Sequence, residues 1–258
     1  MSPYVAEFVG TMLLLLLGNA VVANVVLKNT KGENSGWIVI TFGWGMAVFV
    51  AVFCVAQFSG AHINPAVTVG LAIAGKFELM QVPGYLAAQF AGAAVGAGLV
   101  WLTYRDHFNV TENADAKLAV FCTAPAIRNY PSNLISEIIG TFVLVFAVIH
   151  IATAEIQLSE LETPSAALVS EDTVDAIPVG LGALDALPVG LLVFAIGLSL
   201  GGTTGYAINP ARDLSPRIMH FLLPIPKKRD SDWSYSWIPV VGPFIGGSLA
   251  AILFLAIG

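Results

Sequence analysis

The chain has 258 residues, of which 57% are hydrophobic and only 11% are charged, and its mean hydropathy is +0.81. A soluble domain carries about a quarter charged residues, so this sequence lacks the polar surface that a water-soluble fold needs. The net charge of −6 gives no reason to expect a nucleic-acid partner, and the one basic run, Lys227–Arg229, is expected to be a solvated loop. The composition therefore predicts an integral membrane protein.

Six apolar stretches approach the length of about 20 residues that a membrane-spanning helix needs. The first has no basic residues before it and predicts a retained helix rather than a cleaved signal peptide. A group of glycines in the third, Gly92, Gly96 and Gly98, is expected to let helices pack closely. In chain order the six stretches are roughly Tyr4–Leu27, Trp37–Phe58, Val82–Tyr104, Leu134–Ala154, Leu184–Gly201 and Trp237–Ile257.

Two further apolar stretches, Asn64–Gly75 and Asn209–Leu223, are too short to span a bilayer. At 1.5 Å per residue, about 12 residues cover about 18 Å, which is roughly half of the hydrocarbon thickness. We therefore expect half-helices that enter the membrane and stop near its middle. Because unpaired loop backbone cannot face lipid, the residues before each half-helix must pack in protein or line a wet cavity. This arrangement indicates a pore or a transport site.

The chain also contains an internal repeat. Glu7–Thr11 returns as Glu137–Thr141, and Gly60–Ala66 returns as Gly205–Ala211. Each half therefore reads helix, helix, half-helix, helix. Because three spans is an odd number, the second half enters the membrane from the opposite side. Inverted repeats with interrupted helices are typical of solute sites at the membrane midplane.

The repeat predicts a single domain over residues 1–258, made of two inverted halves at about 1–110 and 130–258. The segment 155–185 breaks the symmetry between them. It carries seven of the 17 acidic residues and no Lys or Arg. We expect a solvated loop there, whose role the sequence leaves open.

Each half-helix opens with an Asn-Pro-Ala triplet. Proline suits the first helical turn, and the asparagine before it can cap the helix, which leaves its amide NH₂ free to face outward. If the half-helices meet end to end, Asn64 and Asn209 offer two donors in the positive potential of two helix N-termini. A hydroxyl or water oxygen can accept from them, whereas cations are repelled and a proton relay is interrupted. The triplets are Asn64, Pro65, Ala66 and Asn209, Pro210, Ala211.

The two Asn-Pro-Ala triplets lie within the segments Ser59–Thr68 and Gly205–Asp213. With these flanking residues they resemble the two Asn-Pro-Ala boxes of the aquaporin (major intrinsic protein) family. The similarity is greatest to the aquaglyceroporin branch of bacterial glycerol facilitators. It implies an all-α membrane fold of six transmembrane helices and two re-entrant half-helices. It also implies a homotetramer in the cell membrane, with the termini in the cytoplasm and passive passage of glycerol, water and similar uncharged solutes. Neither a cofactor, a metal nor enzymatic activity is implied.

The resemblance further implies an outer constriction formed by Trp44, Gly197, Tyr206 and Arg212, which keep the family's spacing from the boxes. Glycine makes room where water-selective members have histidine. The two aromatic residues supply an apolar edge, and Arg212 can hydrogen-bond hydroxyl groups. Tyr206 departs from the phenylalanine of the best-known bacterial member, so the balance among water, glycerol and urea stays open.

Further roles follow from the same resemblance. Glu7 and Glu137 are implied to be buried struts that accept hydrogen bonds from the re-entrant loops, with proton coupling as the alternative. Asp213 is shared by glycerol-conducting members and also suits the first turn of a helix. A ladder of backbone carbonyls is implied along one wall, at Gly60, Ala61, His62, Thr204 and Gly205.

Membrane orientation is contested, because cytoplasmic termini leave most Lys and Arg outside, against the positive-inside rule. We prefer the family's orientation, which places the second box and Arg212 on the external side. Three alternatives stay open for function: a water-selective aquaporin, a secondary active transporter, and a non-conducting adhesive or structural membrane protein.

Overall fold

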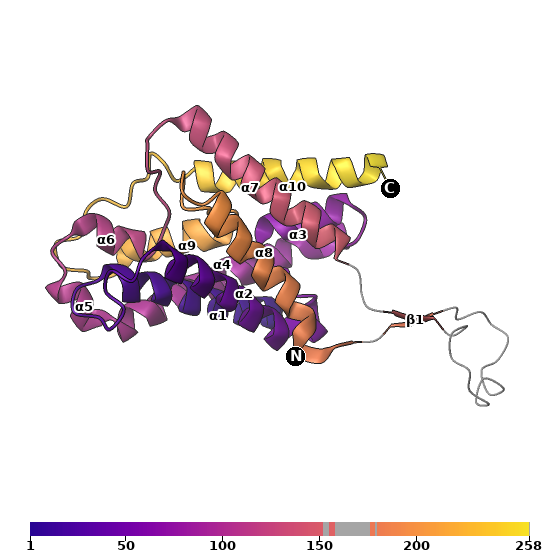
Figure 1. The fold of residues 1–258 in the computed structure, drawn as a ribbon, viewed down its shortest axis with the longest axis horizontal. Coiled ribbons are helices and arrows are strands. Elements are labelled where there is room, and N and C mark those ends of the chain that lie inside the picture. The colour runs from indigo at the N-terminus through magenta and orange to yellow at the C-terminus, as the bar shows by residue number, and fades with distance from the viewer. Residues whose placement is uncertain (152–154, 158–175, 179, 258) are drawn as a thin grey trace.

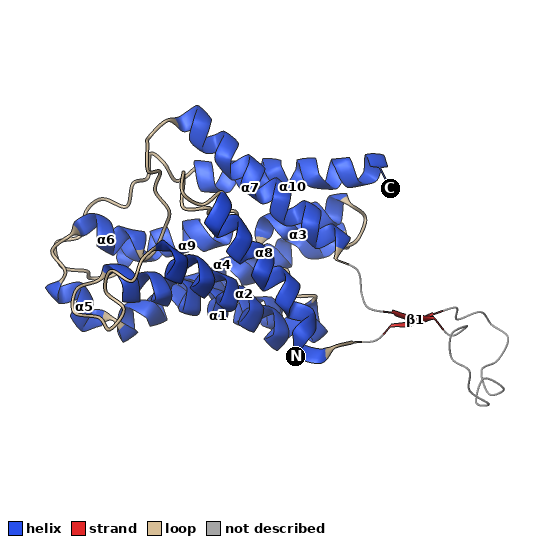
Figure 2. Ribbon diagram, in the orientation of Figure 1, coloured by secondary structure: helices blue, strands red, loops and turns tan. Residues whose placement is uncertain are grey.

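The computed structural model describes residues 1–151, 155–157, 176–178 and 180–257. Within these ranges the chain forms ten α-helices, two 3₁₀ helices and one pair of short strands. The helices form a bundle in which the N- and C-termini lie toward one end and α5 and α6 lie at the other (Figure 1). Figure 2 shows that helix dominates and that the strands stand apart from the bundle.

Six helices are long and apolar enough to cross a membrane, in agreement with the prediction. The fifth of them reaches that length only together with the 3₁₀ turn before it. In chain order they are α1 (Pro3–Val26), α2 (Trp37–Ser59), α4 (Val82–Thr103, after η1, Leu79–Gln81), α7 (Tyr130–His150), α8 (Leu187–Ser199, after η4, Gly182–Ala186) and α10 (Ile238–Ile257).

The two half-helices lie between these long helices. They are α3 (Pro65–Ile73) and α9 (Pro210–Leu222), close to the predicted bounds. Helix α3 packs on α10, helix α9 packs on α4, and the two half-helices also contact one another. Each half-helix therefore packs mainly on helices of the other half of the chain.

Two short helices and two short strands were not predicted. Helices α5 (Arg105–Val110) and α6 (Ala114–Ala119) fold the connection after α4. Strands β1 (Glu155–Gln157) and β2 (Ala176–Pro178) pair antiparallel inside the acidic segment, for which a loop was expected. The rest of that segment up to residue 175 lies outside the described residues.

Glycines set the spacing between the long helices. A Cβ on Gly92 of α4 would lie 2.2 Å from the carbonyl oxygen of Phe8 in α1, and one on Gly246 of α10 would lie 2.3 Å from that of Ile138 in α7. The two halves thus repeat the same close helix contact. Gly98 does not share this role, since the nearest atom to its Cβ position belongs to the flexible side chain of Met219 at 3.5 Å.

The basic run after α9 is not simply solvated, which corrects the expectation for it. The Lys228 ammonium donates to the carbonyl oxygens of His220, Phe221 and Leu223 at 2.6–2.7 Å. These are terminal carbonyls of a helix, which have no partner within the helix and carry its partial negative charge. Arg229 pairs with Asp115 of α6. The run therefore ties the end of α9 to neighbouring segments.

Candidate functional site

Both half-helices begin at an asparagine that caps them. Asn64 and Asn209 have extended backbones, with φ of −156° and −155°. Each Oδ1 accepts a backbone N–H of the first turn, from Ala66 at 2.9 Å and from Ala211 at 3.0 Å. The proline in between lacks an N–H at the first helical position, where the helix itself offers no acceptor. The sequence-predicted caps are thus present at both helix starts.

The two caps also bond across to the opposite loop. Nδ2 of Asn64 donates to the carbonyl oxygen of Ile208, and Nδ2 of Asn209 donates to that of Ile63, both at 2.9 Å. This reciprocal pair holds the two helix N-termini end to end. It also revises the expectation of a free amide NH₂. One N–H of each asparagine is engaged across the junction, and only the second lacks a partner among the described residues.

The residues before each half-helix have an unusual backbone. In the first loop φ is 51° at Ala61 and 43° at Ile63, and in the second it is 39° at Tyr206 and 44° at Ile208. Positive φ is uncommon outside glycine and unfavourable for β-branched residues. Such strain persists only where the surrounding structure holds it in place.

Glu7 supplies that support for the first loop. Its buried carboxylate accepts four hydrogen bonds at 2.7–2.9 Å, from Ser59 Oγ, His62 N, Ile63 N and Gln89 Nε2. A carboxylate in a membrane interior is costly unless it is partnered. The four donors replace the water that burial removed, and they fix the loop on α1 and α4.

Glu137 has the equivalent position under the second loop. It accepts hydrogen bonds at 2.6–3.0 Å from Thr204 Oγ1, Ala207 N and Ile208 N. This carboxylate has one donor fewer. Pro243 stands three residues before Gly246, as Gln89 stands three residues before Gly92, and proline offers no amide side chain. The symmetry of the two supports is therefore incomplete.

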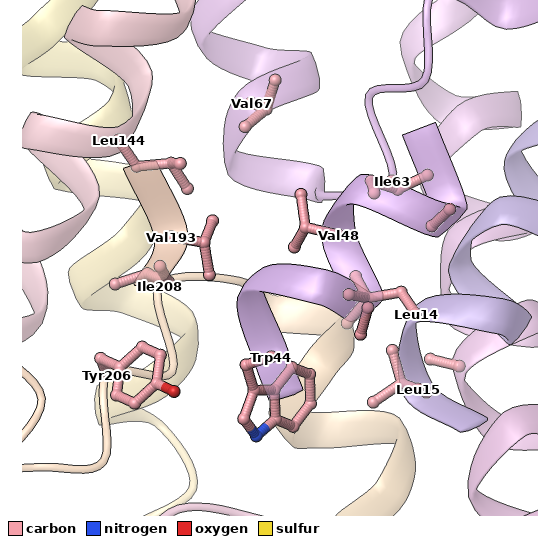
Figure 3. Close-up of a cluster of buried hydrophobic side chains, with 14 of the residues drawn as sticks. Leu14, Leu15, Trp44, Val48, Ile63, Val67, Leu144, Val193, Tyr206 and Ile208 are labelled. Carbon is pink, nitrogen blue, oxygen red and sulfur yellow. The ribbon is translucent and has the colours of Figure 1, made fainter. Parts of the chain in front are cut away.

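A cavity of about 130 Å³ lies where the two loops meet. Residues 60–64 and 206–209 form one part of its wall together with Arg212, and apolar side chains form the rest. Figure 3 shows several of these apolar side chains, among them Val48, Val193, Ile63 and Ile208. A wall with one polar and one apolar side suits a neutral solute that carries both kinds of group.

Three of the predicted constriction residues gather in this wall. The guanidinium carbon of Arg212 lies 4.1 Å from the centre of the Trp44 ring. Tyr206 lies opposite Trp44 with its hydroxyl directed toward it (Figure 3). Tyr206 Oη and Arg212 Nη1 are buried and find no hydrogen-bond partner among the described residues. Leaving such a group unpaired costs about 1–3 kcal/mol, so both residues keep unused hydrogen-bonding capacity beside the cavity.

Gly197 stands behind Tyr206 rather than in the cavity wall. A Cβ on this glycine would lie 2.9 Å from Tyr206 Cζ and 2.9 Å from Thr41 Cγ2. The room expected for solute is therefore filled by the tyrosine ring. Gly197 acts on the cavity indirectly, by letting Tyr206 lie close to α8.

The predicted carbonyl ladder falls partly in the wall. Gly60, Ala61 and His62 belong to it, and within the described residues their carbonyls accept no hydrogen bond. Thr204 and Gly205 do not line it. The threonine is buried with its hydroxyl on the Glu137 carboxylate. The second loop instead lines the cavity directly after Gly205, at Tyr206, Ala207 and Ile208.

Asp213 also lies outside the wall, in a buried ion pair. Its Oδ1 is 2.7 Å from Arg217 Nη2, and both side chains are fully buried. Its Oδ2 accepts hydrogen bonds from the backbone N–H and hydroxyl of Thr123 at 2.7 Å. Arg217 and Thr123 were not predicted as site residues. The one signal in the sequence was the four-residue spacing of the ion pair on a helix.

The chain matches the family described as "Major intrinsic protein" over residues 1–254. That match covers almost its whole length. The chain belongs to the major intrinsic protein family. Together with six helices long and apolar enough to cross a membrane, membership makes this major intrinsic protein an integral, multi-pass membrane protein.

Several similar proteins are named for glycerol uptake. This major intrinsic protein is 56% identical to the "Probable glycerol uptake facilitator protein" of Thermotoga maritima, over 98% of both chains. It is 52% identical to the "Glycerol uptake facilitator protein" of Streptococcus pneumoniae R6, again over 98% of both chains. The X-ray structure of the aquaglyceroporin from Plasmodium falciparum aligns with a TM-score of 0.78 and 28% identity, covering 99% of this chain and 95% of that one.

Proposed function

We propose that this protein is a passive channel for glycerol, water and similar small uncharged solutes. The observation that carries the proposal is the reciprocal asparagine pair at two meeting helix N-termini, in the wall of a cavity with a polar and an apolar side. The names of the two bacterial relatives, identical to this chain at 56% and 52% of positions, support glycerol as the solute.

Selection takes place at Trp44, Tyr206 and Arg212, with Gly197 behind the tyrosine. Glycerol carries CH groups along one edge and hydroxyls along the other. The aromatic faces receive the first edge, while the unpaired donors of Arg212 and the asparagine amides receive the second. Cations are excluded because Arg212 and the two helix N-termini hold a positive potential there.

The remaining predicted residues support this path. Carbonyls of Gly60, Ala61 and His62 accept hydrogen bonds from the passing solute, and the second loop offers its own from Tyr206 to Ile208, beyond the predicted Thr204 and Gly205. Glu7 and Glu137 hold the two loops in their strained conformations. Asp213 acts through Arg217, as an anchor of α9.

We also propose a homotetramer in the cell membrane, with a pore in each protomer, cytoplasmic termini, no cofactor and no catalysed reaction. The chain is then one domain of two inverted repeats, at about residues 1–110 and 130–258. Equivalent contacts in the two halves support the repeat. Glu7 supports the first loop as Glu137 supports the second, and Gly92 allows a close helix contact in the first half as Gly246 does in the second.

Stopped-flow light scattering on proteoliposomes tests the proposal, with glycerol, urea and water compared in the same vesicles. We expect glycerol equilibration well above that of empty liposomes. Replacement of Val193, a residue of the cavity wall, by tryptophan should abolish the increase. Water passage without glycerol passage would support the water-selective alternative. Correctly assembled protein that conducts neither solute would support an adhesive or structural role.

An imposed proton gradient distinguishes a passive channel from a secondary active transporter. A passive channel equilibrates glycerol at the same rate with and without the gradient and accumulates none. Uphill accumulation that is lost in Glu7→Gln or Glu137→Gln would favour coupled transport instead.

A further inference from the structure

Trp37, the first residue of α2, lies outside the cavity wall but contacts two residues of the constriction. Its Nε1–H donates to the carbonyl oxygen of Gly197 at 3.1 Å. Its ring meets the Tyr206 ring edge-on, with centroids 5.8 Å apart and an interplanar angle of 82°. One side chain therefore ties α2 to both α8 and the second re-entrant loop.

The Tyr206 ring is held by packing rather than by hydrogen bonds. Its hydroxyl has no partner among the described residues, so the hydroxyl does not fix the ring orientation. On one side the ring lies over the turn that follows α8, where a Cβ on Gly201 would be 2.4 Å from Tyr206 Cδ1. The same Cβ would be 2.9 Å from Trp37 Cζ2. The absence of side chains at Gly197 and Gly201 thus lets the tyrosine ring approach both residues, and lets the tryptophan ring approach Gly201.

The next turn of α2 continues this support. Thr41 Oγ1 donates back to the carbonyl oxygen of Trp37 at 3.2 Å, and Thr41 Cγ2 lies 2.9 Å from the Cβ position of Gly197. The first two turns of α2 therefore form the layer directly behind Gly197 and Tyr206.

A membrane-interface tryptophan is the simpler explanation for Trp37, because it is 41% exposed and such residues line both interfaces of membrane proteins. Trp237 gives the comparison. It precedes α10, is 43% exposed, and stacks on Tyr130 with centroids 6.3 Å apart. Trp237 makes no described contact with the cavity wall, whereas Trp37 makes a directional hydrogen bond and an edge-on ring contact. An interfacial preference alone explains neither of those.

We propose that Trp37 is a positioning residue that fixes the tilt of Tyr206 and thereby limits the size of the solute that passes. This rests on the proposed function, since it assumes that solute passes Tyr206. Without the indole, the tyrosine ring can tilt into the vacated space and away from Trp44, which widens the cavity between these two residues.

The test compares Trp37→Ala, Trp37→Phe and the matched control Trp237→Ala, each as the full chain in proteoliposomes. Permeabilities to xylitol and glycerol are measured and expressed as a ratio, which does not depend on the amount of active protein. An edge-to-face aromatic pair has a modest energy, so we expect Trp37→Ala to raise the ratio roughly two- to tenfold. Trp37→Phe should fall between Ala and the parent, and Trp237→Ala should leave the ratio unchanged.

An unchanged ratio in both Trp37 variants, or an equal loss for both solutes, would overturn the inference. If Trp37→Ala does not assemble, Trp37→Phe still decides, because it keeps the ring edge but loses the Nε1–H donor. Absence of glycerol passage in the parent protein would instead refute the proposed function. In that case a structure of Trp37→Phe with Tyr206 in its present position would refute the positioning role separately, and a displaced ring would support it.

Discussion

Gly197 influences the site because it has no side chain. Because the Tyr206 ring occupies the adjoining space, any residue at position 197 changes the constriction by moving the tyrosine. The sequence could identify Gly197 from its spacing to the second box. It could not show which neighbour fills the space, because that depends on contacts between α2, α8 and the re-entrant loop.

Replacement of Gly197 by histidine should therefore reduce glycerol permeability far more than water permeability. The imidazole and the displaced tyrosine together narrow the path, and water is the smaller solute. Stopped-flow light scattering measures both. Gly202→His is the control, since a Cβ on Gly202 meets no atom within 4 Å. Equal loss of both permeabilities would place the constriction elsewhere.

The buried ion pair between Asp213 and Arg217 permits a prediction on stability. Removing one member of a buried pair leaves an uncompensated charge and costs about 3–5 kcal/mol. Arg217→Met should lower the free energy of unfolding by that amount, and also loosen the segments whose carbonyls Arg217 binds, at Thr123 and Ser231. Denaturation in mixed micelles measures the change.

The exposed pair of Lys28 and Glu33 supplies the control for that experiment. Surface ion pairs contribute little, so Lys28→Met should leave unfolding unchanged. A similar result for both variants would mean that the buried pair contributes no more than a solvated one.

At the scale of elements, hydropathy located the membrane helices well because each one must bury some 20 apolar residues. The capping asparagines also marked the starts of α3 and α9 within a residue or two, since a cap is a local signal. Helices α5 and α6 escaped prediction because they have only six residues each, and so short a helix depends on the surfaces around it. The strands β1 and β2 escaped for the same reason.

The contact between α1 and α4 leads to a prediction about two glycines of one helix. Gly92→Ala places a methyl group 2.2 Å from the Phe8 carbonyl oxygen, so the helices must separate, at a cost of about 1–3 kcal/mol. Gly98→Ala meets only Met219 at 3.5 Å and should be neutral or slightly stabilising, because alanine favours helix. Thermal unfolding of the purified variants distinguishes the two, and equal melting temperatures would contradict the predicted spacing role.

For the whole molecule, the repeat and the boxes sufficed to predict the family. Orientation, assembly and the residue roles stay predictions. The polar connections between loops could not be predicted, because they join residues far apart in sequence. One example is the pair of hydrogen bonds from the Arg128 guanidinium to Asp232, across 104 positions.

This pair should make stability depend on pH. Burial alone would raise the pKa of Asp232, but the hydrogen bonds and positive charge of Arg128, together with Arg217, hold it below its usual range. A carboxyl with a lowered pKa stabilises the fold above its unfolded-state pKa of about 3.9, and that stabilisation is lost as the pH falls through the lower, folded-state value. Melting temperature should thus decline below about pH 4. Arg128→Met should show a smaller decline, and an identical pH profile would exclude the pair as its cause.

The mutual donation between Asn64 and Asn209 has a mechanical consequence. Neither half-helix N-terminus can retract by itself, because each asparagine donates to the carbonyl oxygen of the residue that precedes the other asparagine. Each loop also donates to a carboxylate on a long helix. The centre of the path should then be its least deformable part, and any opening or closing should take place nearer the two mouths. Hydrogen exchange would register this as slow amides at Ile63 and Ile208. Fast exchange at either amide would mean that the centre of the path itself opens.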